Sequence, residues 1–212
     1  MPSPSSARVR LAVLVSGSGT NLQALLDAIA ADPDFGGDVV VVGADRGDAG
    51  GLERARASGI PTVVQRLDTH PDRQTWEDAL RADLEAYEPD AVVLAGFMRI
   101  LSGRFLAGWP DRVINTHPSL LPAFRGAHAV REALEHGVRV TGSTVHLVDE
   151  QVDHGPIVAQ RPVEVRDDDT ETSLHERIKA VEHELLPACV KLLCHGRLEV
   201  DGRHVRVREE TS

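Results

Sequence analysis

An amide and an imidazole lie two positions apart in the segment 115–122, NTHPSLLP. Asn115 and His117 close a short apolar run, 112–115, that predicts a strand, so their side chains point to the same face. Ligands bind at the carboxyl ends of strands in open α/β sheets. An amide donor beside an imidazole can stabilise an oxyanion and transfer a proton. The alternative, which composition alone favours, is a histidine that caps the loop by bonding the backbone.

A glycine-containing segment, SGSGTN at 16–21, follows a predicted strand and opens a predicted helix. Glycines allow a tight turn, and free N–H groups at a helix start attract an anion. It is a poor dinucleotide fingerprint because Leu22 stands where the third glycine belongs, although Asp45 could contact a ribose. Thr20 and Asn21 add hydrogen-bonding side chains that suit a phosphate monoester. The alternative is a plain strand–helix turn capped by Thr20 or Asn21.

A polar loop, DEQVDHGP at 149–156, separates two predicted strands of the second half. A carboxylate such as Asp153 could orient a histidine or a water molecule there. Taken alone, the loop is better explained as a solvated turn. The 36 positions between His117 and Asp153 give no indication that the two side chains meet.

Short apolar runs alternate with amphipathic stretches along the first half of the chain. This pattern predicts strands buried on both faces and separated by helices, hence a Rossmann-like, open, mainly parallel α/β sheet with helices on both faces. Asp72 is a plausible N-cap for the most amphipathic of these helices. The predicted strands are 9–15, 39–42, 61–64, 91–95 and 112–115, and the predicted helices are 21–31, 51–58 and 72–87.

The second half predicts two longer strands, 143–148 and 157–165, followed by a long helix, 173–193. After the helix, two short apolar stretches flank Asp201-Gly202, which indicates a hairpin with a type I′ turn. We find no internal repeat and no linker that divides the chain. We therefore predict one domain over residues 8–212, preceded by a disordered tail over residues 1–7.

The composition restricts the class of protein. The chain has 212 residues with 42% hydrophobic and 26% charged residues, which is ordinary for one globular domain. A net charge of −10 disfavours general nucleic-acid binding, and no apolar stretch is long enough to span a membrane. The two cysteines do not suggest a disulfide framework, and no signal peptide is visible, so we expect a cytoplasmic protein. No histidine pair has zinc-like spacing with carboxylates, so no metal is expected.

Taken together, five segments resemble the phosphoribosylglycinamide formyltransferase family, the folate-dependent transformylases of purine synthesis. They lie in family order over nearly the whole chain. The motif NxHPSLLP followed by DxGP is specific to formyl-folate transferases and hydrolases, and the SGxGTN opening is specific to this branch. The segments are SGSGTNLQALLDA at 16–28, PDAVVLAGFMRILS at 89–102, INTHPSLLPAF at 114–124, GSTVHLVDEQVDHGPIVAQ at 142–160 and IKAVEHELLP at 178–187.

The resemblance implies formyl transfer from 10-formyltetrahydrofolate, a co-substrate, to the amine of glycinamide ribonucleotide, with no metal. It also implies that Asp153 and His117 meet, in which case the carboxylate is expected to raise the pKa of His117 above about 6.5. Arg125 stands where many members are expected to have proline, and the segment Arg125-Gly126-Ala127 resembles the corresponding segment of methionyl-tRNA formyltransferases. The implied catalytic residues are Asn115, His117 and Asp153; the acceptor-binding residues are Gly19, Thr20, Asn21, Arg73 and Glu182; the folate-binding residues are Met98, Arg99, Ile100, Leu101 and Val148.

Three related alternatives remain. A methionyl-tRNA formyltransferase is expected to carry an additional C-terminal domain, and a formyltetrahydrofolate deformylase an additional N-terminal one without the SGSGTN loop. A non-catalytic folate- or phosphate-binding module is expected to have lost Asn115, His117 or Asp153, and all three are present. We expect small-molecule partners only, no nucleic acid or membrane, and a monomer or homodimer.

Overall fold

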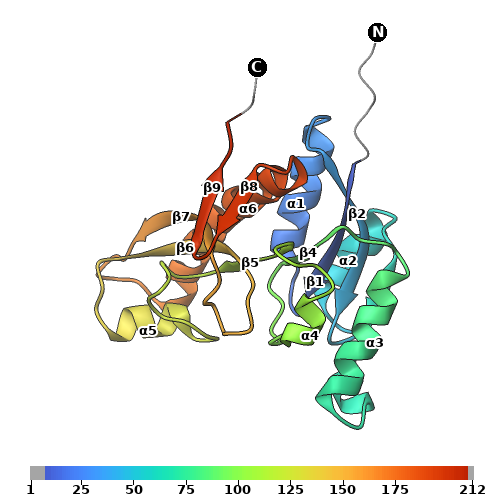
Figure 1. The fold of residues 1–212 in the computed structure, drawn as a ribbon. Helices are drawn as coiled ribbons and strands as arrows, with labels where there is room; N and C mark the ends of the chain where they lie inside the picture. Colours follow the sequence, from blue (N-terminus) through green and yellow to red (C-terminus); the bar gives the residue numbers. More distant parts are fainter. Residues whose placement is uncertain (1–7, 210–212) are drawn as a thin grey trace.

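The computed structural model describes residues 8–209, which form one twisted sheet with helices on both faces (Figure 1). The strand order is β3-β2-β1-β4-β5-β6-β7-β9-β8. The predicted tail at residues 1–7 lies outside the described residues. The strands are β1 (Val9–Val15), β2 (Gly37–Ala44), β3 (Thr62–Val64), β4 (Ala91–Leu94), β5 (Val113–His117), β6 (Val140–Leu147), β7 (Ile157–Glu164), β8 (Leu198–Asp201) and β9 (His204–Val207). The helices are α1 (Thr20–Ala31), α2 (Gly50–Ala57), α3 (Arg73–Glu85), α4 (Gly103–Leu106), α5 (Ala129–Glu135) and α6 (Glu171–Cys194), with a 3₁₀ turn at Leu67–Thr69.

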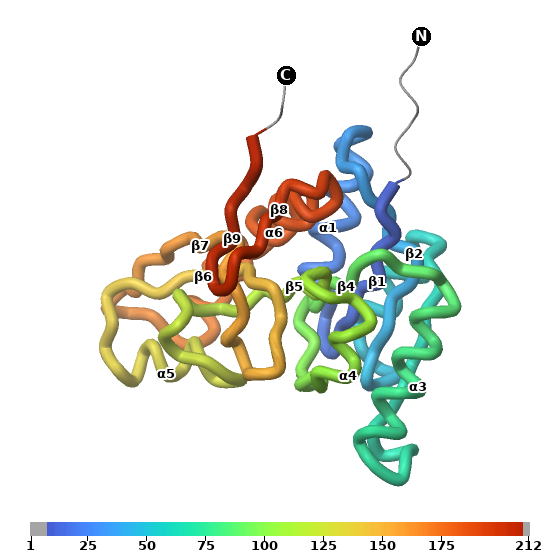
Figure 2. Tube along the Cα trace, in the orientation of Figure 1, coloured from blue at the N-terminus to red at the C-terminus, as the bar shows by residue number. Residues whose placement is uncertain are grey.

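The first five strands are parallel, whereas β6 runs antiparallel to β5 and β7 antiparallel to β6. In Figure 2 the chain passes from the half that holds β1 and β2 to the half that holds β6 and β7, with β5 between them. The predicted α/β class, with a mainly parallel sheet covered on both faces, is confirmed. Because β1, β4 and β5 are parallel, their carboxyl ends meet at the same edge of the sheet.

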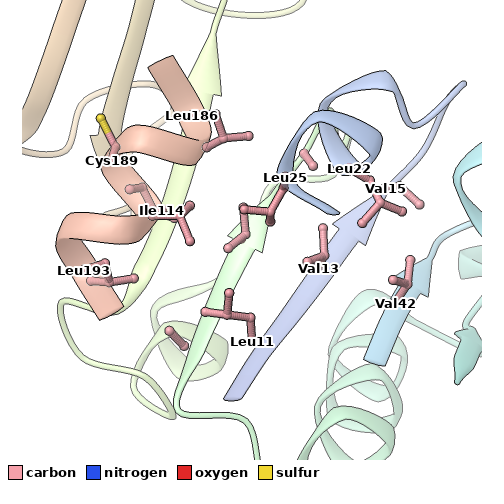
Figure 3. Packing of buried hydrophobic residues seen from close by; sticks show 14 of the residues in the cluster. Leu11, Val13, Val15, Leu22, Leu25, Val42, Ile114, Leu186, Cys189 and Leu193 are labelled. Atoms are coloured by element: carbon pink, nitrogen blue, oxygen red, sulfur yellow. The ribbon is translucent and has the colours of Figure 1, made fainter. Parts of the chain in front are cut away.

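Side chains of successive strand residues enter two separate cores. In β1, Leu11, Val13 and Val15 pack with α1, α2 and α6, whereas Ala12 and Leu14 pack with α3 and α4. All five are fully buried, as expected for a parallel strand covered on both faces. Figure 3 shows the first core, where α1 and α6 contribute leucines above β1 and β5. The sheet thus separates two faces, called here the α6 face and the α3 face.

The predicted strands and long helices agree with the structure to within a few residues at their ends. Asp72 caps α3 as predicted, because its side chain accepts a hydrogen bond of 2.7 Å from the N–H of Thr75. Periodicity missed α4 and α5, which are too short to show a helical repeat. No helix within residues 8–209 is long and apolar enough to cross a bilayer.

The terminal hairpin forms, but its turn differs from the prediction. Asp201 pairs with His204, so the two loop residues are Gly202 and Arg203, not Asp201 and Gly202. Gly202 has a φ of +59°, and Arg203 is not in the positive-φ region that a type I′ turn requires at both positions. The predicted type I′ turn is therefore wrong. Glycine occupies the first loop position because it alone adopts positive φ there without steric cost.

Helix α6 carries Glu182 and is held against the sheet by apolar side chains on the same helix. Leu186, one turn beyond Glu182, is fully buried in the α6-face core (Figure 3). A capping box at Thr170 and Ser173 begins the helix. The packing of α6 against the sheet therefore fixes where Glu182 lies relative to β5.

We predict that Leu186→Ala lowers the free energy of unfolding by about 2–5 kcal/mol, because the removed methyl groups leave a cavity in a closely packed core. Urea denaturation measures this loss. Val207→Ala, at a side chain with 44% exposure, is the control and should change stability by less than about 0.5 kcal/mol. Equal effects of the two substitutions would show that α6 is not anchored through Leu186.

Candidate active site

The end of β5 places an amide and an imidazole on the α3 face of the sheet. Val113 of this strand packs in the α3-face core and Ile114 in the α6-face core, so alternation puts Asn115 and His117 on the α3 side. His117 is buried, with 5% of its surface exposed. The two residues lie where a parallel strand ends, as the sequence predicts.

The loop between β6 and β7 brings a carboxylate to this imidazole. It starts beside β5, where Val148 N–H donates to the carbonyl of Val113 at 2.9 Å, and it returns toward the other end of the strand. There Oδ2 of Asp153 lies 3.3 Å from Nδ1 of His117. The same Oδ2 accepts a hydrogen bond of 2.7 Å from the N–H of Gly126. The pairing of His117 with Asp153, which spacing alone did not indicate, is present.

Both ring nitrogens of His117 face hydrogen-bond acceptors. Nε2 lies 2.8 Å from the carbonyl oxygen of Phe124, and a carbonyl can only accept, so Nε2 carries a proton. Asp153 at Nδ1 favours a second proton there. Burial lowers the pKa of His117 and outweighs the opposing effects of Asp153 and the Phe124 carbonyl. The expectation that the pKa lies above about 6.5 is therefore wrong, because desolvation of the imidazolium exceeds its attraction to the carboxylate.

Asp153 remains a carboxylate despite its partial burial. Burial raises its pKa, but the neighbouring His146, His117 and the Gly126 N–H lower it by more, so the net pKa is below the usual value. Asp153 has a φ of +48°, and Phe124, which supplies the carbonyl facing His117, has a φ of +50°. Left-handed backbone at non-glycine residues costs free energy and is concentrated at functional sites.

His146 joins this group, although no motif in the sequence analysis pointed to it. It lies on β6 directly opposite Asn115 in the antiparallel register, with only 2% of its surface exposed. Its Nε2 is 3.1 Å from Nδ2 of Asn115 and 3.8 Å from Oδ1 of Asp153. The signal that could have found it is the alternation of Thr144 and His146 with the apolar Val145 and Leu147, but only the register shows that His146 lies opposite Asn115.

The segment 16–21 forms a tight turn that exposes the start of α1. Gly19 is the N-cap residue, with a φ of +72°, and no side chain caps the helix there, contrary to the alternative of a turn capped by Thr20 or Asn21. A Cβ on Gly19 would lie 2.4 Å from Cα of Gly51, so glycine is needed for contact with α2. Arg54 of α2 braces the turn by donating from Nε to the Ser18 carbonyl at 2.8 Å. The uncapped N–H groups of α1 are suited to an anion.

Asn21 and Glu182 meet on the α6 face, opposite the imidazole. Nδ2 of Asn21 donates to Oε2 of Glu182 at 3.1 Å, and Oγ1 of Thr116 donates to Oε1 at 3.4 Å. Burial raises the pKa of Glu182, although these two hydrogen bonds oppose that shift. Oδ1 of Asn21 is buried without a hydrogen-bond partner among the described residues. The predicted acceptor-binding residues Asn21 and Glu182 are therefore in direct contact.

Arg73 lies apart from Glu182, on the α3 face. Its guanidinium donates to the carbonyl of Ile100 and lies 3.4 Å from Oε1 of Glu77. It is therefore next to the segment 98–101, which the resemblance assigns to folate, and not next to the other predicted acceptor-binding residues.

Some side chains of the segment 98–101 are exposed to solvent, and others are buried. Met98 is 69% exposed and Ile100 53%, whereas Leu101 is 2% exposed and packs in the α3-face core. Arg99 donates from Nε to Oδ2 of the buried Asp45 at 2.7 Å. This pairing engages one oxygen of the Asp45 carboxylate, and the other, Oδ1, is buried without a hydrogen-bond partner among the described residues.

The loop 148–153 lies close to this segment. Val148 packs against the α3-face core. A Cβ on Gly103, two residues beyond Leu101, would lie 1.9 Å from Oε1 of Glu150. Both predicted folate-lining segments thus border one region of the α3 face. Within residues 8–209, no group of three or more histidine, cysteine, aspartate or glutamate residues is arranged to hold a metal ion.

Comparison with known proteins identifies one family. Residues 9–190 match the family described as formyl transferase. The chain is 51% identical over 200 residues to a phosphoribosylglycinamide formyltransferase of Mycobacterium tuberculosis, covering 94% of this chain and 92% of that one. It is 40% identical over 192 residues to the Escherichia coli protein of the same name, covering 91% and 90%. A solved glycinamide ribonucleotide transformylase 1 from Symbiobacterium toebii superposes with a TM-score of 0.93 at 47% identity, covering 96% of both chains.

We predict that the glycines of the 16–21 turn have separable roles. Gly19→Ala should destabilise the fold by about 1–3 kcal/mol, because it forces a side chain into left-handed backbone and against α2. Gly17→Val should leave the melting temperature nearly unchanged, because a Cβ there meets no atom within 4 Å. Its side chain should nevertheless obstruct access of the acceptor to the turn.

Calorimetric titration of Gly17→Val measures the second effect. Affinity for glycinamide ribonucleotide, the implied acceptor, should fall while folate affinity is retained. Equal loss of both ligands, or no loss of either, would contradict the assignment of this turn to the acceptor.

We also predict that His117 titrates below about 6.5 in the wild-type chain, because burial disfavours its charged form. Asp153→Asn keeps the shape but removes the negative charge that favours the imidazolium, so the midpoint should fall further. A histidine NMR titration of both proteins measures this. A wild-type midpoint above 6.5, or an unmoved midpoint in Asp153→Asn, would contradict the balance of burial and charge described above.

Proposed function

The chain belongs to the formyl transferase family and is a folate-dependent formyltransferase, and from this premise we propose that it transfers the formyl group of 10-formyltetrahydrofolate to the amine of glycinamide ribonucleotide. The relatives that carry the name phosphoribosylglycinamide formyltransferase support this acceptor. The reaction is a step of de novo purine biosynthesis. The cytoplasmic location and a monomeric or homodimeric state stay predictions.

The observation that carries the proposal is the convergence of Asn115, His117 and Asp153 at the end of β5. Asp153, in the loop between β6 and β7, approaches to 3.3 Å from His117 at the end of β5, although the two residues are distant in sequence. An amide donor, an imidazole and a carboxylate are groups suited to formyl transfer to an amine, two as donors to the oxyanion and one for the protons.

Asn115 acts on the oxygen of the formyl group. The acceptor amine attacks the formyl carbon, the carbonyl π bond opens, and negative charge develops on that oxygen in a tetrahedral intermediate. The side-chain amide of Asn115 has two N–H groups, of which one lies against His146, and the other donates to the oxygen. A fixed donor in a site shielded from water stabilises the transition state more than the ground state.

His117 supplies a second donor. Its Nε2–H donates to the carbonyl of Phe124, and the substrate oxygen takes the place of that carbonyl when it binds. The lowered pKa leaves the ring mainly neutral near pH 7, and the neutral ring with its proton on Nε2 still donates. The role assigned to His117 therefore does not depend on its being charged.

Asp153 assists the proton transfers. The attacking nitrogen must lose a proton after the new C–N bond forms, and the folate nitrogen must gain one as its C–N bond breaks. The lowered pKa keeps Asp153 ionised, so its carboxylate holds a water molecule that relays this proton between the two nitrogens. No metal takes part in these steps.

The two substrates approach from different sides of the strand ends. The uncapped N–H groups of α1 beside Gly19 and Thr20 bind the phosphate, and Asn21 and Glu182 on the α6 face bind the ribose. The exposed side chains of Met98 and Ile100 contact the folate, with Arg99, Leu101 and Val148 supporting that segment. Arg73, bonded to the Ile100 carbonyl, also serves the folate side in this proposal, although the sequence suggested the acceptor side.

The alternatives receive less support. A methionyl-tRNA formyltransferase or a formyltetrahydrofolate deformylase is not favoured by relatives that carry the glycinamide ribonucleotide activity in their names. A silent binding module is not consistent with an intact amide–imidazole–carboxylate group. Arg125 is exposed in the loop beside Gly126 and takes no part in the proposed mechanism.

A formyl-transfer assay tests the activity. The purified chain is given 10-formyltetrahydrofolate with and without glycinamide ribonucleotide, and release of tetrahydrofolate is followed together with the formylated product. Turnover should require the amine and yield equal amounts of both products. Folate release without the amine would indicate a deformylase, and formylation of methionyl-tRNA alone would indicate the tRNA enzyme.

We predict that Asn115→Ala reduces kcat by roughly a hundred- to a thousandfold, because it removes one oxyanion donor. KM for both substrates should change little, since the interaction forms mainly in the transition state. Steady-state kinetics on the folded variant measures both constants. A reduction below tenfold would contradict the oxyanion role of Asn115.

A further inference from the structure

The geometry points to His146 as a positioning residue: we propose that its neutral ring, protonated on Nδ1, orients the Asn115 amide so that one N–H faces the histidine and the other faces the reacting oxygen. The inference rests on the oxyanion role proposed above for Asn115. It concerns a residue that touches neither substrate in the proposed mechanism and acts only through Asn115.

The register of the sheet creates this contact. Asn115 on β5 and His146 on β6 are direct partners in the antiparallel ladder, and side chains of such partners lie on the same face within contact distance. Nε2 of His146 lies 3.1 Å from Nδ2 of Asn115. Both strands are internal to the sheet, so ladders on both sides hold the backbones of the two residues in this register.

The environment of the other ring nitrogen determines the tautomer. Nδ1 of His146 lies 2.8 Å from the carbonyl oxygen of Leu147, which has no proton to donate. Nδ1 must therefore carry a proton in any arrangement that satisfies this contact. In the neutral ring the remaining nitrogen, Nε2, then presents a lone pair toward Asn115.

A lone pair at Nε2 settles which end of the Asn115 amide faces the histidine. The amide NH₂ group attracts a lone pair, whereas the amide oxygen would be repelled by it. One hydrogen of the NH₂ group is donated to Nε2 of His146. Because the amide is planar, its second hydrogen then points away from the ring. With a rotatable amide, the same residue could present its oxygen to the oxyanion, which would raise the barrier instead of lowering it.

Asp153 is the charged group that faces His146 from the β6–β7 loop, and His117 is the titratable group on the neighbouring strand. Oδ1 of Asp153 is 3.8 Å from Nε2, longer than a hydrogen bond, so the shorter contact of this nitrogen is with Asn115. A ring protonated on both nitrogens would instead donate to Asp153 and repel the NH₂ group. That arrangement is the competing one, and it predicts the opposite orientation of Asn115.

Two substitutions of nearly equal polarity separate positioning from structural support. In His146→Gln, the side-chain carbonyl can reach the place of Nε2 and accept from Asn115. In His146→Asn, the shorter amide can replace only Nδ1, so it can still donate to the Leu147 carbonyl but leaves Asn115 without its acceptor. A melting curve for each variant confirms that both are folded under the assay conditions.

Steady-state kinetics with 10-formyltetrahydrofolate and glycinamide ribonucleotide gives the first test. His146→Asn should lower kcat by roughly tenfold or more, a part of the hundred- to thousandfold effect of an oxyanion donor, with KM nearly unchanged. His146→Gln should restore most of kcat. The double variant Asn115→Ala, His146→Asn should be no slower than Asn115→Ala alone, because a positioning residue has no effect once its target is gone. Equal losses in the Gln and Asn variants, or multiplied losses in the double variant, would overturn the proposal.

Nitrogen-15 NMR of the labelled histidines in the resting enzyme gives a second test that does not depend on activity. His146 should show a protonated Nδ1 and an unprotonated Nε2 at the assay pH. A proton on Nε2, in either the other neutral tautomer or the imidazolium, would overturn the inference. If Asn115→Ala retains its kcat while NMR shows the expected tautomer of His146, the proposed oxyanion role of Asn115 is wrong. The assignment of the His146 tautomer then still stands.

Discussion

The antiparallel pairing of β5 with β6 is the constraint on which the candidate site depends. It sets Asn115 opposite His146 and His117 opposite Thr144, and it starts the loop that returns Asp153 to His117. The hydroxyl of Thr144 then holds the turn after His117, by donating to the Ser119 carbonyl at 2.7 Å and accepting from the Leu121 N–H at 3.0 Å. A slip of β6 by one residue would turn His146 and Thr144 to the other face of the sheet, away from Asn115 and His117.

The sheet also separates two groups of polar side chains, one on each face. Asn115, His117, His146 and Asp153 lie together on the α3 face, whereas Glu182 lies on the α6 face with Asn21 and Thr116. Asn115 and Asp153 are partly buried and the other side chains of the two groups are buried, and backbone groups complete their hydrogen bonding, because an unpaired buried polar group is costly. In the proposed function, one substrate reaches both groups at the carboxyl ends of β1 and β5.

Burial and charge act in opposite directions within the candidate catalytic group, and their balance decides the protonation of His117 and Asp153. Desolvation lowers the pKa of His117 more than Asp153 raises it, while the neighbouring histidines and the Gly126 N–H lower the pKa of Asp153 despite its burial. The result is a mainly neutral imidazole beside an ionised carboxylate near neutral pH. In the proposed mechanism, that combination provides a neutral donor for the oxyanion and a base for the relayed proton.

The sequence by itself determined the layout of the fold and most of the candidate residues. Apolar runs and helical repeats predicted the parallel strands and long helices, since these depend on local pattern, and the spacing of Asn115 and His117 predicted their common face. Family resemblance indicated Asp153 and Glu182. The tertiary structure alone decided that Arg73 lies beside Ile100, that desolvation lowers the pKa of His117, and that His146 faces Asn115. These depend on strand register, loop path and depth of burial, which arise from contacts between residues far apart in the chain.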